Sequence, residues 1–249
     1  MFCNGAFDMA ERGSDLPTGA FDRVTTLTFD VFGTVLDLGG SLTPPLAQLL
    51  AKKGAADAAN QVWARWRDRQ RIEQYQDTLL MMGHSGYTEA ARRALLYSLR
   101  QFGVPFTDDD VAELMAEWTE LKPFDDCLVG LERLKARFRL VVLSNGERDF
   151  LEHLVRNRIR FPFDEIVSVD EVGVFKPHPA VYRRAALRCR CEPHELMLIS
   201  SNSFDVMGAR ACGHRGAWVD RYGLPFEETP YQPDLVVKDF TELADRLLS

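Results

Sequence analysis

Asp30 is the residue whose type and position best suit it to do chemistry. It follows the apolar run 24–29 and stands before Gly33 and Thr34, where the chain has to turn. Backbone N–H groups at such a turn can face an anion, and an aspartate placed there can act as a covalent nucleophile. For this segment alone, a carboxylate that only caps the next turn is an equally good interpretation. The choice depends on which other side chains the fold brings to Asp30.

Two further polar clusters follow apolar runs of the same kind. Ser144 and Asn145 offer a hydroxyl and an amide. Lys176 precedes Pro177, which restricts the backbone and makes an ordinary surface lysine the less favoured interpretation. Tyr182 lies six residues beyond the lysine. These positions predict a second and a third group of site residues.

The last polar cluster begins at Ser200, after the apolar run 196–199, and ends at Asp205. It contains the amide of Asn202 and the aromatic ring of Phe204. A cluster of this composition can cap a helix, with the carboxylate in the first turn. It can also place a hydroxyl, an amide and a carboxylate together at a strand end. Because the other clusters also end strands, we expect the second role.

The spacing of these clusters predicts an α/β fold. Five apolar runs are typical of buried parallel strands: 24–29, 140–143, 166–169, 196–199 and 216–219. Helical stretches alternate with them: 126–137, 147–158, 179–188 and 205–212. Such alternation predicts a Rossmann-like, doubly wound parallel sheet, whose site lies beyond the carboxyl ends of the strands. The polar clusters should therefore surround one crevice.

Residues 39–122 have a different pattern, without a convincing strand. Helical periodicity dominates in four segments: 46–52, 58–81, 87–102 and 108–121. Thr107, followed by acidic residues, is typical of a helix N-cap. We interpret 39–122 as a helical cap domain inserted into a core domain of residues 21–38 and 123–249. Residues 1–20 are acidic and broken by Gly and Pro, which predicts a flexible leader.

The composition excludes some classes of partner. The chain has 249 residues and a formal net charge of −7, which argues against nucleic acid or an anionic membrane as partner. A small anionic substrate would need cations of its own at the site. The five cysteines and five histidines lack paired metal-ligand spacing, which predicts reduced thiols in the cytoplasm and no metal or cofactor. No apolar run reaches the roughly 18 residues of a membrane span.

Taken together, the four clusters resemble the haloacid dehalogenase superfamily. In chain order they are FDVFGT, LSNG, VGVFKPHPAVY and SSNSFD, and they span nearly the whole chain. Their combination is far more specific than any one of them alone. The resemblance implies a Rossmann-like core with a helical cap, which the pattern of strands and helices also predicts. It further implies that Asp30 is the nucleophile.

Two departures from that superfamily's pattern favour one reaction over another. Most members are phosphatases, with a second aspartate two residues after the nucleophile and an acidic magnesium ligand in the last cluster. This chain has Phe32 and Ser201 at those positions. A phosphoryl mechanism would lose a proton donor and a metal ligand, whereas expulsion of a halide needs neither. The chain instead resembles the 2-haloacid dehalogenase branch, including Trp66 and Arg67 in the cap.

The resemblance to this branch implies catalytic roles. Asp30 attacks the halogen-bearing carbon of an (S)-2-haloacid and forms an ester. Lys176 holds Asp30 ionised, since an opposite charge favours the charged form. Asp205, with Ser200 and Asn202, positions and activates the water that hydrolyses the ester.

The resemblance also implies residues that bind the substrate. Thr34 and Ser144 donate hydrogen bonds to Asp30 and the substrate carboxylate. Arg67 and Asn145 hold the departing halide. The sequence leaves open which arginine of the segment does so, because three more lie nearby: Arg65, Arg69 and Arg71.

Aromatic residues complete the expected site. Phe32 and Phe204 stand where branch members often have Tyr and Trp, so they should shape the pocket. Tyr182 could hydrogen-bond Lys176 or only pack. The resemblance also suggests a homodimer.

Three alternatives to a dehalogenase remain open on the sequence. A phosphatase would use the same fold and the same Asp30. A ring-opening hydrolase of azetidine-2-carboxylate would need an acid for the leaving amine, and the sequence offers no clear candidate. A catalytically silent binding protein on this fold is disfavoured, because Asp30, Lys176 and Asp205 are all retained.

Overall fold

The computed structural model describes residues 21–81 and 83–249, so the leader predicted at 1–20 lies outside the described residues. Its centre is a six-stranded parallel sheet with the order β5-β4-β1-β6-β7-β8. The strands are β1 (Thr26–Phe29), β4 (Arg139–Ser144), β5 (Glu165–Ser168), β6 (Leu196–Ser200), β7 (Arg215–Val219) and β8 (Leu235–Val237). The predicted α/β fold is confirmed, and the sequence prediction lacked only β8 of this sheet.

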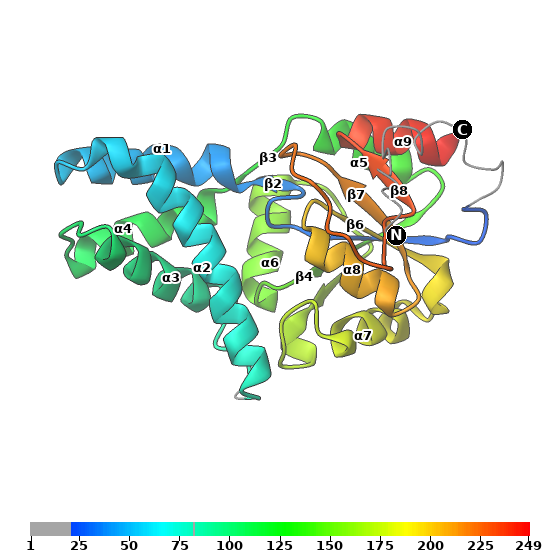
Figure 1. Ribbon diagram of the computed structural model, residues 1–249. Helices are drawn as coiled ribbons and strands as arrows, with labels where there is room; N and C mark the ends of the chain where they lie inside the picture. Colours follow the sequence, from blue (N-terminus) through cyan, green and yellow to red (C-terminus); the bar gives the residue numbers. More distant parts are fainter. Residues whose placement is uncertain (1–20, 82) are drawn as a thin grey trace, which may run out of the picture.

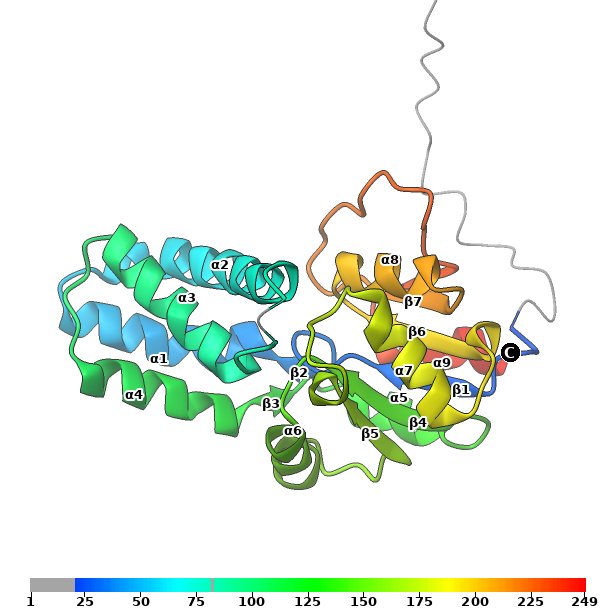
Figure 2. The ribbon, with the colours of Figure 1, turned by 90° about the horizontal axis from the view of Figure 1, so that it is seen from below.

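Helices cover both faces of the sheet. One face carries α5 (Cys127–Leu134) and α9 (Phe240–Leu248), and the other carries α7 (Pro179–Cys189) and α8 (Ser203–Ala211) (Figures 1 and 2). After β4 the chain forms α6 (Arg148–Leu154), which continues into the π-helical segment Val155–Ile159. Because both faces are covered, the central strands β1 and β6 are buried along their whole length. Within the described part of the chain, no helix is both long and apolar enough to span a membrane.

Four helices form a separate group beyond the carboxyl end of the sheet, and a pair of two-residue strands connects this group to the rest of the chain. The pair is β2 (Leu36–Asp37) and β3 (Lys122–Pro123), which run antiparallel. Between them lie α1 (Leu38–Lys52), α2 (Ala59–Leu79), α3 (Tyr87–Gln101) and α4 (Asp108–Ala116). In Figure 1 these helices form a separate layer beside the sheet. We call residues 38–121 the helical insertion.

The first helix of the insertion begins eight residues earlier than the sequence predicted. The prediction started at Leu46, and the preceding Gly39, Gly40, Pro44 and Pro45 all disfavour a helix interior. In the structure α1 begins at Leu38 and includes both prolines. Its N-cap Asp37 accepts a hydrogen bond from the N–H of Gly40 at 2.8 Å, and its leucines are buried. Capping and tertiary burial therefore outweigh the poor local propensity.

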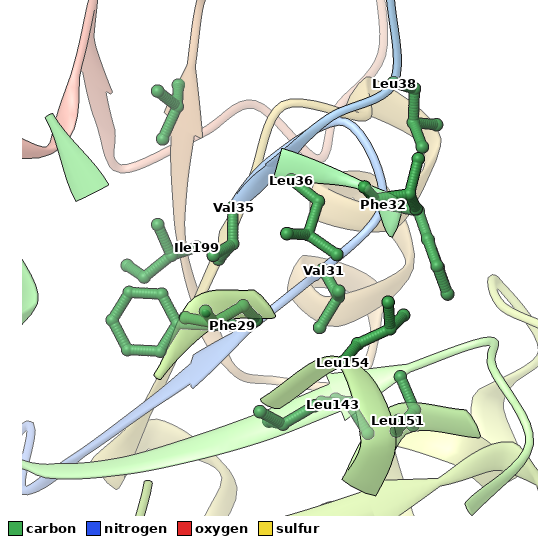
Figure 3. Close-up of a cluster of buried hydrophobic side chains, with 14 of the residues drawn as sticks. Phe29, Val31, Phe32, Val35, Leu36, Leu38, Leu143, Leu151, Leu154 and Ile199 are labelled. Atoms are coloured by element: carbon green, nitrogen blue, oxygen red, sulfur yellow. The ribbon is translucent and has the colours of Figure 1, made fainter. Parts of the chain in front are cut away.

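Buried side chains fix the segment that carries Asp30. Phe29 and Val31, its neighbours in sequence, are both 0% exposed. Figure 3 shows them in one apolar cluster with Val35, Leu143 and Ile199, which belong to the following turn, to β4 and to β6. The polar residue between them has little freedom to move, because a displaced backbone would open a cavity in this packing.

Candidate active site

The carboxylate of Asp30 lies just beyond β1 and is surrounded by donors. The backbone N–H of Asp30 donates to the carbonyl of Ile199 at 3.0 Å, so its pairing with β6 continues to this residue. Oδ2 accepts hydrogen bonds from the hydroxyl of Thr34 at 2.8 Å and from the amide of Asn202 at 2.9 Å. Oδ1 lies 3.3 Å from the ammonium of Lys176. These contacts fix the direction in which Asp30 presents its oxygens.

Lys176 lies between two buried carboxylates. Its Nζ is 3.3 Å from Asp30 Oδ1 and 2.8 Å from Asp205 Oδ2, and the residue is 1% exposed. Burial alone lowers the pKa of Lys176, but the charges of Asp205 and Asp30 outweigh burial and leave the pKa raised. The side chain is therefore an ammonium at neutral pH. The expected pairing of Lys176 with the candidate nucleophile is present in the structure.

Asp205 is the second carboxylate of the site, in the first turn of α8. Burial raises the pKa of Asp205, the ammonium of Lys176 opposes this, and the charge of Asp30 adds to it, with a net upward shift. The phenol of Tyr182 donates to Oδ1 at 2.7 Å. The sequence had left open a bond from this tyrosine to the lysine, whereas its hydroxyl bonds the carboxylate. A carboxylate with a raised pKa is a stronger base toward water.

Three residues of the last cluster act on Asp30 by different routes. Asn202 donates to it directly. Ser201 donates its backbone N–H to the hydroxyl of Thr34 at 2.8 Å, which orients that hydroxyl toward Asp30. The hydroxyl of Ser200 accepts the N–H of Asn202 at 3.1 Å, so Ser200 acts through the backbone that carries the amide. Within this cluster, direct contact with the carboxylate is therefore limited to the amide of Asn202.

Ser144 and Asn145 end β4 beside the same site. The hydroxyl of Ser144 accepts a long hydrogen bond from the N–H of Gly146, at 3.5 Å. The Oδ1 of Asn145 accepts the backbone N–H of Lys176 at 2.8 Å, and its Nδ2 lies 3.5 Å from Oε1 of Gln74. Asn145 therefore joins the lysine loop to the helical insertion, a contact that the sequence did not predict.

Helix α2 of the insertion provides the wall that faces the strand ends. Arg67, Gln70, Arg71 and Gln74 line a cavity of about 20 Å³ together with Asp30, Lys176, Asn202 and Asp205. This volume is enough for about one water molecule. The four residues of α2 follow helical spacing on one face, so the buried face of this helix is polar where it meets the site.

The structure shows which of the four arginines lie at the cavity, a question that the sequence left open. Arg65 and Arg69 turn away from the cavity, where they donate to Gln101 at 2.8 Å and to Glu73 at 2.7 Å. Arg67 lines the cavity. Arg71 also lines it, and its Nη2 pairs with the exposed Asp68 at 2.6 Å. Arg67, which the sequence favoured, is therefore one of two arginines at the site.

Aromatic rings close the cavity on two sides. The ring of Phe32 stacks on that of Tyr87 with centroids 3.9 Å apart. Burial raises the pKa of Tyr87 to about 12, against the opposing charge of Arg67, so the hydroxyl stays protonated at neutral pH. Phe204 lines the cavity and meets Tyr75 edge-on at 6.0 Å.

Sequence reasoning missed three residues of this site, Gln70, Gln74 and Tyr87, and named Arg71 only as an alternative to Arg67. Gln70 and Gln74 share a face of α2 with Arg67, and their spacing was visible in the sequence. The sequence assigned only Arg67 of this face to the site, because polar side chains in a helix are usually exposed. The burial of Gln70 and Gln74, 1% and 4% exposed, shows that this face points inward.

The donor set does not resemble a metal site. Among the described residues, no group of three or more His, Cys, Asp or Glu side chains could hold a metal ion. The two carboxylates are bridged by the ammonium of Lys176.

Comparison with known proteins places the chain in a family. A family model described as haloacid dehalogenase-like hydrolase matches residues 24–213. Haloacetate dehalogenase H-2 of Moraxella sp. (strain B) is 30% identical over 217 residues, which cover 86% of this chain and 94% of that protein. The (S)-2-haloacid dehalogenase H-109 of Pseudomonas putida is 30% identical over 225 residues, 89% and 97% of the two chains.

Solved structures agree with the sequence comparison. The L-2-haloacid dehalogenase of Xanthobacter autotrophicus with chloropropionic acid covalently bound has a TM-score of 0.78 at 26% identity and covers 91% of this chain and 99% of that chain. Another L-2-haloacid dehalogenase structure has a TM-score of 0.85 at 26% identity, with 91% and 99% covered. This chain belongs to the haloacid dehalogenase-like hydrolases.

Proposed function

We propose that this chain is a hydrolytic dehalogenase that converts (S)-2-haloalkanoic acids, or haloacetate, to 2-hydroxyacids and halide without a metal. The observation that carries the proposal is that one buried ammonium, on Lys176, joins two carboxylates in a single cavity. One carboxylate can then attack carbon while the other activates water. The printed names of the relatives, and the covalently bound chloropropionic acid of the Xanthobacter autotrophicus structure, support the proposal.

The charges that line the cavity suit a monoanionic substrate. Three cations face two carboxylates there: Arg67, Arg71 and Lys176 against Asp30 and Asp205. Among the residues that line the cavity, positive charges therefore exceed negative charges by one, which suits one substrate carboxylate; Arg71 also pairs with Asp68, which is exposed and does not line the cavity. A chain with a net charge of −7 needs such a local surplus to attract an anion.

In the first step Asp30 displaces the halide. One of its carboxylate oxygens attacks C2 of the acid, a C–O bond forms, and the carbon–halogen bond breaks. The halide leaves with the bonding electron pair and takes no proton. Attack from the side opposite the halide inverts C2. Thr34 and Asn202 hold the attacking group in position, which removes much of the entropic cost of the displacement.

In the second step Asp205 takes a proton from a water molecule, whose oxygen adds to the carbonyl carbon of the Asp30 ester. The tetrahedral intermediate then expels the oxygen of the hydroxyacid, which receives the proton from Asp205. Hydrolysis leaves Asp30 as a carboxylic acid, which releases one proton to solvent and so restores the carboxylate. The bond between C2 and oxygen stays intact. An (S)-2-haloacid therefore gives an (R)-2-hydroxyacid. The raised pKa of Asp205 makes it a more effective base for this step.

Metal independence follows from the same residues. Lys176 already neutralises part of the charge on Asp30 and Asp205, and halide departure requires no Lewis acid. A matched panel tests this: halide release from (S)-2-chloropropionate and chloroacetate, and phosphate release from small phosphate esters, each with EDTA and with added Mg²⁺. We expect halide release that EDTA does not change. Phosphate release that requires Mg²⁺ would identify a phosphatase instead.

Isotope labelling tests the covalent route. The reaction is run in H₂¹⁸O with enzyme in excess over (S)-2-chloropropionate. If an ester forms, the hydroxyl oxygen of the first product comes from Asp30, and the oxygen of water enters the carboxylate of Asp30. We therefore expect unlabelled product and an Asp30 peptide that carries about one ¹⁸O atom, by mass spectrometry. Labelled product with an unlabelled peptide would mean that water attacks the substrate directly.

A further inference from the structure

Two glutamines of α2 have amide groups with unused donors at the cavity. Gln70 and Gln74 are 1% and 4% exposed, and both line the cavity. Within residues 21–81 and 83–249, neither Nε2 atom has a hydrogen-bond partner. Buried N–H groups are nearly always paired in folded proteins, so each such group calls for an explanation. A ligand that accepts hydrogen bonds in the cavity would supply one.

The surrounding hydrogen bonds fix which end of each amide is free. A guanidinium can only donate, so the contact with Arg67 holds Oε1 of Gln70 toward the arginine. The backbone N–H of Lys176 donates to Oδ1 of Asn145, which leaves Nδ2 of that amide facing Oε1 of Gln74. Both glutamine oxygens are therefore engaged, and both NH₂ groups remain as donors.

We propose that Gln70 and Gln74, together with Arg67, donate hydrogen bonds to the departing halide. This inference rests on the proposed function. In the displacement, the leaving group lies in line with the attacking oxygen, on the far side of the carbon. Asp30 attacks from the end of β1, and α2 forms the facing wall of the same cavity. A halide that leaves within this cavity is therefore placed among the side chains of α2 that line it.

This role predicts a dependence on the halogen. Negative charge develops on the halogen mainly in the transition state, so donors placed there raise kcat more than they lower KM. Fluoride accepts hydrogen bonds more strongly than chloride, and chloride more strongly than bromide. Loss of the donors should therefore slow the reaction most for the strongest acceptor. A glutamine that only supported packing would affect all halides alike.

The test uses Gln70→Met and Gln74→Met, which keep the side-chain length and remove the amide. Gln76→Met is the matched control, because Gln76 lies on the same helix, is exposed and lies outside the residues that line the cavity. Halide release is measured for fluoroacetate, chloroacetate and bromoacetate. We expect kcat of the two variants to fall by about tenfold or less for bromoacetate. The expected fall is about 100-fold for fluoroacetate, or for chloroacetate if the wild type does not hydrolyse fluoroacetate. KM should change little, and the control should match the wild type.

Equal losses for every halide, or full activity in both variants, overturn the inference. If a methionine variant does not fold, Gln74→Glu keeps the shape and replaces the donor with an acceptor, and the same halogen dependence is expected. Chloride binding is also measured without turnover, as the increase in melting temperature with added chloride. The halide site is supported if chloride raises the melting temperature of Gln76→Met but not that of Gln74→Met. This result would hold even if the enzyme hydrolysed no haloacid. Failure to hydrolyse any haloacid would refute only the proposed function.

Discussion

Replacement of Lys176 by methionine removes the central charge of the site and nearly preserves its volume. The ammonium lies 3.3 Å from Asp30 and 2.8 Å from Asp205. With an effective dielectric constant of about 20, Coulomb's law gives attractions of about 5 and 6 kcal/mol. The desolvation of the ammonium offsets part of this, and loss of one partner from a buried ion pair typically costs about 3–5 kcal/mol. We expect Lys176→Met to lower the free energy of unfolding by about 3–5 kcal/mol at neutral pH.

The size of this loss should depend on pH. Without the ammonium, the carboxylates of Asp30 and Asp205 repel each other, so the folded variant binds a proton with a pKa above that of the unfolded chain. Stability from such a group is present below the unfolded pKa and is lost as pH rises through the folded pKa. The wild type retains its ammonium over this range, because the pKa of Lys176 is raised. The deficit of Lys176→Met should therefore be smaller near pH 5 than near pH 8.

Urea unfolding, followed by tryptophan fluorescence at both pH values, measures this deficit. Lys52→Met is the control, since Lys52 is exposed at the end of α1 and should cost no more than about 0.5 kcal/mol. Adding Asp205→Asn to Lys176→Met should restore part of the stability, because it removes one uncompensated charge. A deficit that is equal at both pH values, together with no recovery in the double variant, would refute the electrostatic account of this site.

Three further changes test other contacts of the site. Tyr182→Phe removes a hydrogen bond that lowers the pKa of Asp205, so the acid limb of the pH–kcat profile should move to higher pH, and an unmoved limb would contradict the role of that carboxylate as the base. Thr34→Val removes a buried hydroxyl that both donates and accepts, and urea unfolding should show a loss of about 1–3 kcal/mol. Arg67→Ala should reduce kcat for halide release by about 100-fold or more, whereas Arg65→Ala, outside the cavity, should leave it nearly unchanged; the reverse result would place the halide elsewhere.

The elements that carry the site were predictable because their signals are local. Asp30, Ser144 and Ser200 each follow a buried run of apolar residues, and parallel strands bring their carboxyl ends to one edge of a sheet. The contact between Lys176 and Asp205 was not predicted, since the resemblance implied only the pairing of Lys176 with Asp30 and 29 residues separate Lys176 from Asp205 in sequence. Nothing in the composition of either segment specifies that distance.

The parts that were missed depend on tertiary context. Gln70 and Gln74 are polar residues of a helix, and only the position of α2 over the strand ends makes them buried. The start of α1 was missed because the burial of Leu38 and Leu42 outweighs the glycines and prolines beside them. Strand β8 has three residues, with Val236 exposed, which is too short a pattern to identify.

The position of β1 in the sheet has a consequence for how the chain folds during synthesis. Among the strands of residues 21–81 and 83–249, β1 leaves the ribosome before the others, yet its two neighbours pair it at residues 139–142 and 196–199. Both edges of the strand that leads to Asp30 therefore stay without their final partners until most of the chain has been made. The contacts within the helical insertion are closer in sequence and can form earlier. Unpaired apolar edges invite aggregation, so the interval between the emergence of β1 and that of β6 is the stage at which a nascent chain would most need a chaperone.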